Sequence, residues 1–208
     1  MILAIIFKIN TTYYDAAKKY IVNALTITSE SFDAYSQGAA SVALSDAQIW
    51  NVVAKAATGV NSAAIKNTNA VTLVLTSADV KKTGFLTSYC GWHSYNTTLG
   101  TSVKYSFVGN PGTATSCGAQ AVSINGDRGA DAMASIIAHE IEEAATDPEL
   151  NAWYDSRGYE NADKCAWNFG TTTTDPSGYK WNQTFGGKKF LIQQNWVNAG
   201  GGSCKQGI

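Results

Sequence analysis

The sequence predicts a single α/β (α+β) domain over residues 1–208, in which helices pack on a mixed sheet. A length of 208 residues suits one domain and allows it a proper hydrophobic core. Short apolar runs rich in β-branched residues, such as "AVTLVLTS" at 70–77, predict buried strands. An apolar stripe of helical period at 131–146 predicts a helix. No internal repeat, charge block or long linker divides the chain, so a second domain is not expected.

The first third of the chain is expected to mix strand and helix. Residues 1–7, "MILAIIF", are apolar, but no basic residue precedes them and no small-residue cleavage site follows cleanly. This pattern favours a buried first strand over a clipped signal peptide, and we interpret residues 1–30 as part of a truncated N-terminal segment. A helix is predicted with Ser45 or Asp46 as its N-cap and Gly59 as its end.

Three later segments are expected to be strands. Residues 103–110, "VKYSFVGN", alternate between apolar and polar and are closed by the turn signal "NPG". The segment "GAQAVSIN" at 118–125 is expected to be a neighbouring strand, and "KKFLIQQNWV" at 188–197 the final one. Residues 155–187 are rich in Gly, Thr, Asn and aromatic side chains, so we expect an irregular C-terminal region that a disulfide ties down.

Charge and hydropathy exclude several classes of protein. The net charge of −1 predicts no general attraction to nucleic acid or to an anionic membrane. No stretch approaches the roughly 20 apolar residues of a membrane-spanning helix. No Walker A, GxGxxG or GxSxG motif is present, so neither nucleotide binding nor a Ser–His–Asp hydrolase is expected.

Cysteine usage and sequons favour an extracellular protein. The 4 cysteines include no CxxC pair, which argues against a zinc knuckle, and their even number fits two disulfides in an oxidising compartment. The simplest pairing joins each cysteine to a partner in the same half of the chain, although the sequence permits three connectivities. These pairs are Cys90 with Cys117 and Cys165 with Cys204. The three acceptor sequons for N-glycosylation begin at Asn10, Asn96 and Asn182.

The helix predicted at 131–146 places a histidine beside its apolar face. Asp131 is a plausible N-cap, and Pro148 is expected to end the helix because the residue before proline disfavours helical angles. His139 and Glu143 lie about 40° apart on the flank of the apolar face, one turn from each other. The apolar face itself consists of Met133, Ile137, Ile141 and Ala144.

This spacing matches the H-E-x-x-H zinc-binding helix with glutamate in place of the second histidine. His139 and Glu143 can reach one ion with Glu140 beside them, whereas Glu142 is expected to point to solvent. A carboxylate oxygen binds Zn²⁺ at nearly the same distance as an imidazole nitrogen, so we expect Zn²⁺. The same ligands could take Mn²⁺ or Ca²⁺. The alternative is a charged, solvated helix face that binds no metal.

A catalytic zinc site needs a third protein ligand, and "GYENADKC" offers two carboxylates. Asp163 lies 20 residues after Glu143 (163 − 143), the offset of the third ligand in thermolysin-type enzymes, and Glu160 is its close competitor. Asp147 is expected to lie outside the ligand set, because an acid at a helix C-terminus meets the wrong end of the dipole. His93 is either structural or an active-site residue that orients substrate or stabilises an oxyanion.

The motifs "CGWHSY", "YSFVGNPG", "SINGDRGADAM", "HEIEEAATDPELNAWYD", "ENADKCAW" and "FLIQQNWV" occur in this order. Over residues 35–204 the chain resembles the EXORDIUM / phosphate-induced protein 1 family, specifically its fungal- or oomycete-like branch. The resemblance implies a secreted, extracellular or cell-wall protein, and a zincin-like core in members that retain the HExxE segment. The residues that carry over are His139, Glu140, Glu143, Glu160, Asp163, Cys165 and Cys204.

Two hypotheses for function follow. In the first, the protein is a secreted zinc-dependent metallohydrolase of the peptidase type, with His139, Glu143 and Asp163 as metal ligands. Glu140 is then the general base that activates a water molecule. Its expected partner is a peptide, a protein or a cell-wall component, and a monomer is expected. In the second, the protein is a non-catalytic extracellular or cell-wall binding or signalling module with a structural metal or none.

Overall fold

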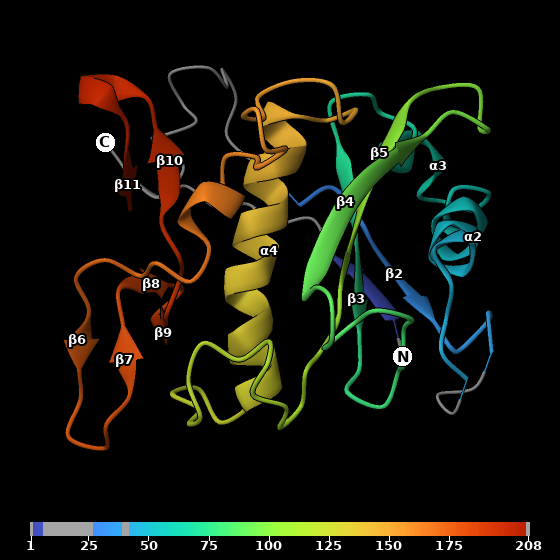
Figure 1. Cartoon of the computed structure of the whole chain (residues 1–208). Helices are drawn as coiled ribbons and strands as arrows, with labels where there is room; N and C mark the ends of the chain where they lie inside the picture. The colour runs from blue at the N-terminus through green and yellow to red at the C-terminus, as the bar shows by residue number, and fades with distance from the viewer. Residues whose placement is uncertain (1, 6–26, 39–41, 207–208) are drawn as a thin grey trace.

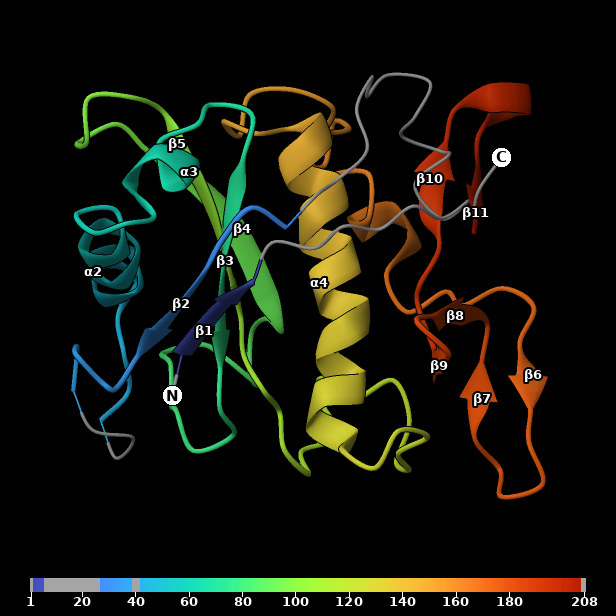
Figure 2. The ribbon, with the colours of Figure 1, turned by 180° about the vertical axis from the view of Figure 1, so that it is seen from behind.

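The computed structural model describes residues 2–5, 27–38 and 42–206. These residues form a mixed α/β domain with one five-stranded sheet, several two-stranded sheets and two disulfides. Helix α4 (Arg128–Thr146) stands between the large sheet and the C-terminal part of the chain, as Figure 1 shows. Helix α2 (Asp46–Ala56) lies on the other side of that sheet, which the reverse view in Figure 2 makes clear.

The large sheet is mixed, as the sequence predicts. Its order is β2-β1-β3-β5-β4, in which β3 and β5 are parallel and the other neighbours are antiparallel. The N-terminal strand is therefore confirmed, with β2 and β3 as its neighbours. The five strands are β1 (Ile2–Ile5), β2 (Glu30–Asp33), β3 (Val71–Thr76), β4 (Gly91–Asn96) and β5 (Val103–Val108).

Alternation along the strands assigns their side chains to two faces of the sheet. On β3, Val74 packs into the cluster around α2, whereas Leu73 packs into the cluster around α4. On β4, Trp92 belongs to the α2 side. Its neighbours Gly91 and His93 therefore face α4. The alternation of side chains along β4 thus brings His93 to the helix that carries His139.

Both long helices begin at side-chain caps. Ser45 caps α2 and forms a capping box with Gln48, so the predicted start of this helix is confirmed. The short helix α3 (Ser62–Ile65) follows α2 in the chain. Helix α4 begins earlier than predicted, because Asp127 is its N-cap and accepts a hydrogen bond from the backbone of Ala130 at 3.0 Å. The prediction of Asp131 as the cap is therefore wrong.

The predicted strand at 118–125 is also wrong, since these residues form a loop. The carboxylate of Asp131 accepts hydrogen bonds from the backbone N–H groups of Ile124 and Asn125 at 3.0 and 3.1 Å. A helix side chain thus satisfies backbone donors that a neighbouring strand would otherwise have to satisfy.

The C-terminal region is largely irregular, as predicted, but its final strand is divided in two. Between the two parts, the side chain of Asn182 accepts from the backbone N–H of Ile192 at 2.9 Å and donates to its C=O at 2.7 Å. This amide replaces a strand partner, so the single strand predicted at 188–197 is wrong. The short strands are β6 (Thr173–Thr174), β7 (Lys180–Trp181), β8 (Gln183–Phe185), β9 (Lys188–Phe190), β10 (Asn195–Val197) and β11 (Ser203–Lys205).

Two disulfides tie loops to these elements, and both predicted pairings are confirmed. Cys90–Cys117 joins the residue before β4 to the loop that follows β5. Cys165–Cys204 joins the 3₁₀ turn η2 (Asp163–Cys165) to β11. None of the helices in the described ranges is long and apolar enough to cross a membrane.

Candidate metal centre

Helix α4 and strand β4 bring both histidines of the chain to one acidic cluster. Glu140 and Glu143 on α4 are buried, at 3% and 4% exposure, and His139 beside them is partly buried. His93 faces these glutamates from β4 and is itself 7% exposed. The sequence separates the histidines by 46 residues (139 − 93), so their approach results from the packing of α4 on the sheet.

Three of the predicted ligands form what we call the outer group: His139, Glu143 and Asp163. Nε2 of His139 lies 3.0 Å from Oε1 of Glu143 and 3.4 Å from Oδ1 of Asp163. The backbone N–H of Asp163 also donates to Oε1 of Glu143 at 3.0 Å, which fixes the turn η2 against the helix. The Cys165–Cys204 disulfide holds the other end of this turn.

Gln193 is a site residue that the sequence analysis missed. Its side-chain Nε2 lies 2.9 Å from Nδ1 of His139 and donates to the backbone C=O of Ala162 at 3.1 Å. Gln193 is only 3% exposed, and its backbone N–H donates to Ser135 on α4. It therefore fixes the ring orientation of His139 from the side opposite Glu143 and Asp163. No local motif marks Gln193, because it lies in the irregular segment between β9 and β10.

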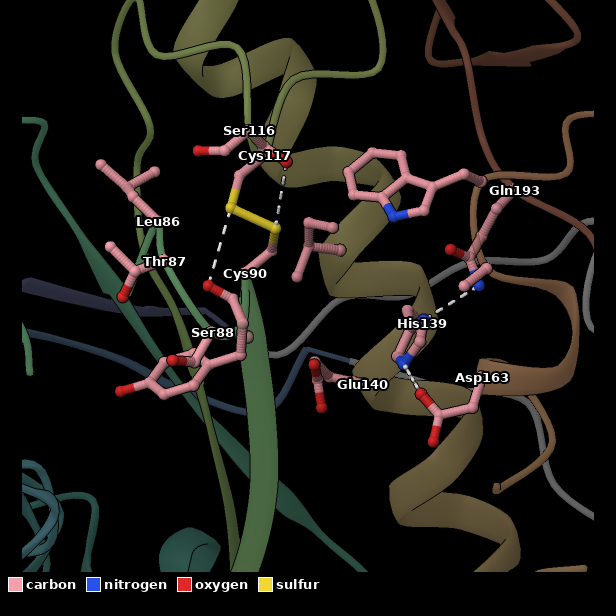
Figure 3. A pocket seen from close by; sticks show the side chains of 15 residues that line it. Leu86, Thr87, Ser88, Cys90, Ser116, Cys117, His139, Glu140, Asp163 and Gln193 are labelled. Atoms are coloured by element: carbon pink, nitrogen blue, oxygen red, sulfur yellow. Dashed lines mark hydrogen bonds and ion pairs between the residues drawn. A yellow bond between two sulfur atoms is a disulfide. The ribbon is translucent and has the colours of Figure 1, made fainter. Parts of the chain in front are cut away.

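A pocket of about 350 Å³ opens onto the outer group. His139, Glu140 and Asp163 line one side of it, and the Cys90–Cys117 disulfide lies across from them (Figure 3). Trp167, which is 45% exposed, and Gln193 also line it. A water molecule or a substrate in this pocket can therefore reach the carboxylate of Glu140 and the histidine beside it.

A second set of residues, which we call the inner group, consists of His93, Glu143 and Glu160. Nδ1 of His93 lies 3.6 Å from Oε2 of Glu143, and its Nε2 lies 3.5 Å from Oε1 of Glu160. Nε2 also lies 3.0 Å from the backbone C=O of Asp147. Asp147 is the C-cap of α4 and accepts from two backbone N–H groups beyond it, consistent with its predicted position outside the ligand set.

Electrostatic coupling within the cluster shifts several pKa values. Burial acts to lower the pKa of His93, but the carboxylates of Glu140 and Glu143 outweigh burial and raise it to about 10. Burial also acts to lower the pKa of His139, but the charge of Glu143 outweighs burial and raises that pKa well above its ordinary value. Burial acts to raise the pKa of Glu143, but the charge of His139 lowers it to about 2. Without a cation, the carboxylates thus favour the protonated form of both histidines, and for His139 this form requires Gln193 to turn its amide oxygen towards Nδ1.

Glu142 does not point to solvent, so that prediction is wrong. Its side chain is fully buried, because the C-terminal region covers the face of α4 that lies away from the sheet. Nδ2 of Asn161 contacts its Oε1 at 3.4 Å. Burial, followed by the charge of Glu143, raises the pKa of Glu142 to about 8, and the same two causes raise the pKa of Glu160 to about 8.

The donor atoms of both groups fit a divalent cation. In each group, one nitrogen or oxygen from every member lies within 4.8 Å of the others. Imidazole nitrogen and carboxylate oxygen are ligands that Zn²⁺ accepts in four-coordinate sites. Oε2 of Glu140 and Oε1 of Glu160 are buried and have no hydrogen-bond partner among the described residues, as expected of atoms that a ligand satisfies. The identity of the metal and its ligands stays a prediction.

The predicted glycosylation sites lie in different surroundings. Asn10 is outside the described residues. Asn96 ends β4, and its side chain accepts from the backbone of Thr98 at 2.9 Å. The side-chain nitrogen of Asn182 donates to two backbone carbonyls inside the C-terminal region. Glycosylation at these positions stays a prediction.

The fold and the cluster together define a disulfide-bonded mixed α/β domain with histidines and carboxylates gathered around one helix. The chain belongs to the phosphate-induced protein 1 family, because residues 3–206 match the family's conserved region. It is similar to Protein EXORDIUM-like 3 of Arabidopsis thaliana, at 35% identity over 60% of this chain and 45% of the relative. It is also similar to Protein EXORDIUM-like 5 of the same plant, at 30% identity over 71% of this chain and 49% of the relative.

The chain spans about half the length of these curated relatives. No solved structure matches it significantly. The two disulfides and the EXORDIUM-like relatives are consistent with an extracellular protein.

Proposed function

We propose that this domain is a secreted metallohydrolase of the peptidase type, acting in the extracellular space or cell wall through a zincin-like site. One observation carries the proposal. The buried carboxylate of Glu140 lines the same pocket as His139 and Asp163, which belong to a group of donor atoms that fits Zn²⁺. A base, a cation site and room for substrate are therefore adjacent.

In this proposal His139, Glu143 and Asp163 hold the cation. A cation held by these residues would supply a Lewis acid that lowers the pKa of a water molecule and polarises the substrate carbonyl. Glu140 accepts the proton from that water at its carboxylate and later returns it to the leaving amine. Burial raises the pKa of this carboxyl above its ordinary value, so Glu140 is a stronger base than an exposed glutamate.

His93 is assigned a positioning role rather than contact with the substrate. It faces Glu140 from behind, with Nδ1 at 3.7 Å from Oε2 of Glu140, and it is not among the residues that line the pocket. The earlier expectation that His93 stabilises an oxyanion would require it to reach the pocket. Trp167 is the aromatic wall against which a peptide could pack.

The decisive test compares Glu140→Gln with the parent protein on a library of quenched fluorescent peptides. The variant keeps the shape of the side chain and removes the base, so we expect retained metal and activity lowered by about 10²-fold or more. His139→Ala should lose the cation held by His139, Glu143 and Asp163 as well as the activity. The exposed glutamate Glu30 provides the matched control, because Glu30→Gln makes the same chemical change away from the cluster. Parental activity in Glu140→Gln would refute the mechanism.

The second candidate function is a non-catalytic extracellular binding or signalling module. It is favoured by the ion pairs within the cluster, since protonated histidines can compensate the carboxylates without a metal. Elemental analysis of protein made in an oxidising host and purified without a metal-affinity tag tests the cation that the first candidate requires. No bound metal, and no thermal shift on adding Zn²⁺, Mn²⁺ or Ca²⁺, would favour the binding module.

A further inference from the structure

The two oxygens of Glu143 face different histidines. Oε1 lies 3.0 Å from Nε2 of His139 in the outer group, whereas Oε2 lies 3.6 Å from Nδ1 of His93 in the inner group. A carboxylate in this position can ligate one cation with each oxygen. Only one of the two groups is needed for the proposed hydrolysis, so the inner group requires its own explanation.

We propose that the inner group is a second divalent-cation site, bridged to the outer one by Glu143. Its ligands are His93, Glu143 and Glu160, whose donor atoms lie within 4.8 Å of one another. The inference rests on the proposed function because the two sites share Glu143. Paired cations about 3.5–4 Å apart, joined by shared ligands, are a common arrangement in hydrolytic enzymes.

Unpartnered oxygens beside the group point independently to a ligand. Oε2 of Glu140 has no hydrogen-bond partner in the described part of the chain, and its side chain is 4% exposed. This atom is aimed at His93, with Nδ1 at 3.7 Å. Oε1 of Glu160 is likewise buried without a hydrogen-bond partner among the described residues, and it forms an ion pair with Nε2 of His93 at 3.5 Å. Buried carboxylate oxygens normally have a partner, and a cation supplies one.

The surroundings of His93 prepare its ring to bind a metal. Its Nε2 lies 3.0 Å from the backbone C=O of Asp147, which can only accept a hydrogen bond. Nε2 therefore carries the proton in the neutral ring, and Nδ1, which faces Glu140 and Glu143, is left with a lone pair. Glu160 lies on the Nε2 side of the ring, so its carboxylate would have to turn towards Nδ1 to join a cation held there. A ligating histidine usually donates its other N–H to such a carbonyl.

Charge balance also favours two cations over one. The two groups and Glu140 together contain four carboxylates, which carry four negative charges when ionised, and two histidines, which are neutral as metal ligands. One divalent cation in the outer group leaves His93 free to carry a proton, and four ionised carboxylates then keep one uncompensated negative charge, which is costly where the carboxylates are buried. Two divalent cations compensate all four. These carboxylates are Glu140, Glu143, Glu160 and Asp163.

The inner cation would act through the residues that it holds. His93 and Glu160 do not line the pocket, so a cation between them lies behind the outer site and away from substrate. It would fix Glu143 as a bridge and restrain Glu140 in the orientation needed for catalysis. The inner site is thus a positioning site rather than a second reaction centre.

Metal stoichiometry tests the proposal on the full chain. The protein is saturated with Zn²⁺, freed of loosely bound ion, and analysed for zinc per chain. We expect two ions in the parent, one in Glu160→Gln and one in His139→Ala. The combined Glu160→Gln/His139→Ala variant should bind none, and Glu30→Gln, an exposed change of the same kind, should keep two.

Anomalous scattering at the zinc edge provides a readout that needs no variant. Crystals of the parent should give two peaks about 3.5–4 Å apart with Glu143 between them. Saturation of the parent at one ion, or two ions in a folded Glu160→Gln variant, would overturn the inner site. A different result would contradict the proposed function alone. If the parent binds two ions and Glu140→Gln keeps full activity, the inner site stands and hydrolysis through Glu140 is refuted.

Discussion

Gly91 on β4 lies directly against the carboxylate of Glu140 on α4. A Cβ built on Gly91 would be 2.7 Å from Oε1 of Glu140 and 2.7 Å from the side chain of Ile136. Strand and helix can approach this closely only because residue 91 has no side chain. The position of the proposed base therefore depends on a glycine in the neighbouring strand.

The substitution Gly91→Ala should displace Glu140 and separate α4 from β4. We expect a loss of about 1–3 kcal/mol in the free energy of unfolding, the usual cost of overpacking, together with lower activity. Urea denaturation measures the first effect. Gly59→Ala is the matched control, because its added Cβ would meet only a backbone oxygen at 3.8 Å. Equal stability of the two variants would contradict the close contact at Gly91.

Gln193 should matter for metal affinity through its contact with His139. Replacement by Leu removes the group that orients the ring, and loss of such an outer partner lowers metal affinity about 10- to 100-fold. Competition with a chromophoric chelator measures the affinity, and the NMR signals of the His139 ring report its orientation in the metal-free protein. Gln120→Leu is the control, since that side chain hydrogen-bonds the backbone of Lys180 instead. Unchanged affinity and ring signals in Gln193→Leu would refute the positioning role.

Trp167 should contribute to substrate binding rather than to the chemical step. It lines the pocket, so Trp167→Ala is expected to raise KM about tenfold and leave kcat nearly unchanged, as loss of uniform binding does. Trp153 offers a closely matched control. Both side chains are 45% exposed and both residues have a positive φ, but Trp153 does not line this pocket. Similar kinetics for Trp167→Ala and Trp153→Ala would argue against a substrate contact at Trp167.

Asp33 should make stability depend on pH in the acid range. Burial acts to raise its pKa, but hydrogen bonds from Ser36 and Lys55 outweigh burial, so the pKa lies below its ordinary value. The ionised carboxylate therefore stabilises the fold above its unfolded pKa of about 4, and this contribution is lost as the pH falls through the lowered value. We expect Asp33→Asn to cost about 1–2 kcal/mol at pH 7 and progressively less below pH 4.

Chemical denaturation across this pH range measures the difference between Asp33→Asn and the parent. The exposed Glu30 on the same strand gives the control, and Glu30→Gln should show little effect at any pH. A difference for Asp33→Asn that stays constant from pH 7 to pH 3 would mean that ionisation of Asp33 is not its source.

Local patterns in the sequence were sufficient for much of the fold. The β-branched run of β3, the Ser45 cap of α2 and the end of α4 before Pro148 are each encoded within a few residues, and each prediction was confirmed. Errors arose where a distant side chain replaced a local partner. Asp131 satisfies a loop instead of capping its helix, and Asn182 interrupts the final strand.

The candidate site likewise contains some residues that local patterns could place and others that they could not. His139 and Glu143 could be placed together from the sequence because helical periodicity puts residues i and i+4 on one flank. Periodicity could not predict that Glu142 is buried, because the C-terminal region that covers it folds back from elsewhere in the chain. It also gave no indication of Gln193, or of His93 behind Glu140.

The family, the disulfide-bonded mixed α/β class and the acidic helix with its histidine could all be predicted from the sequence, since they depend on composition, motif order and short-range periodicity. Three relationships became visible only in the folded domain: Glu143 faces two histidines, Glu160 lies with His93 while Asp163 lies with His139, and Gly91 leaves room for Glu140. These relationships depend on how α4 packs between the sheet and the C-terminal region. Such packing is set by contacts between residues that are far apart in the chain, which no local pattern records.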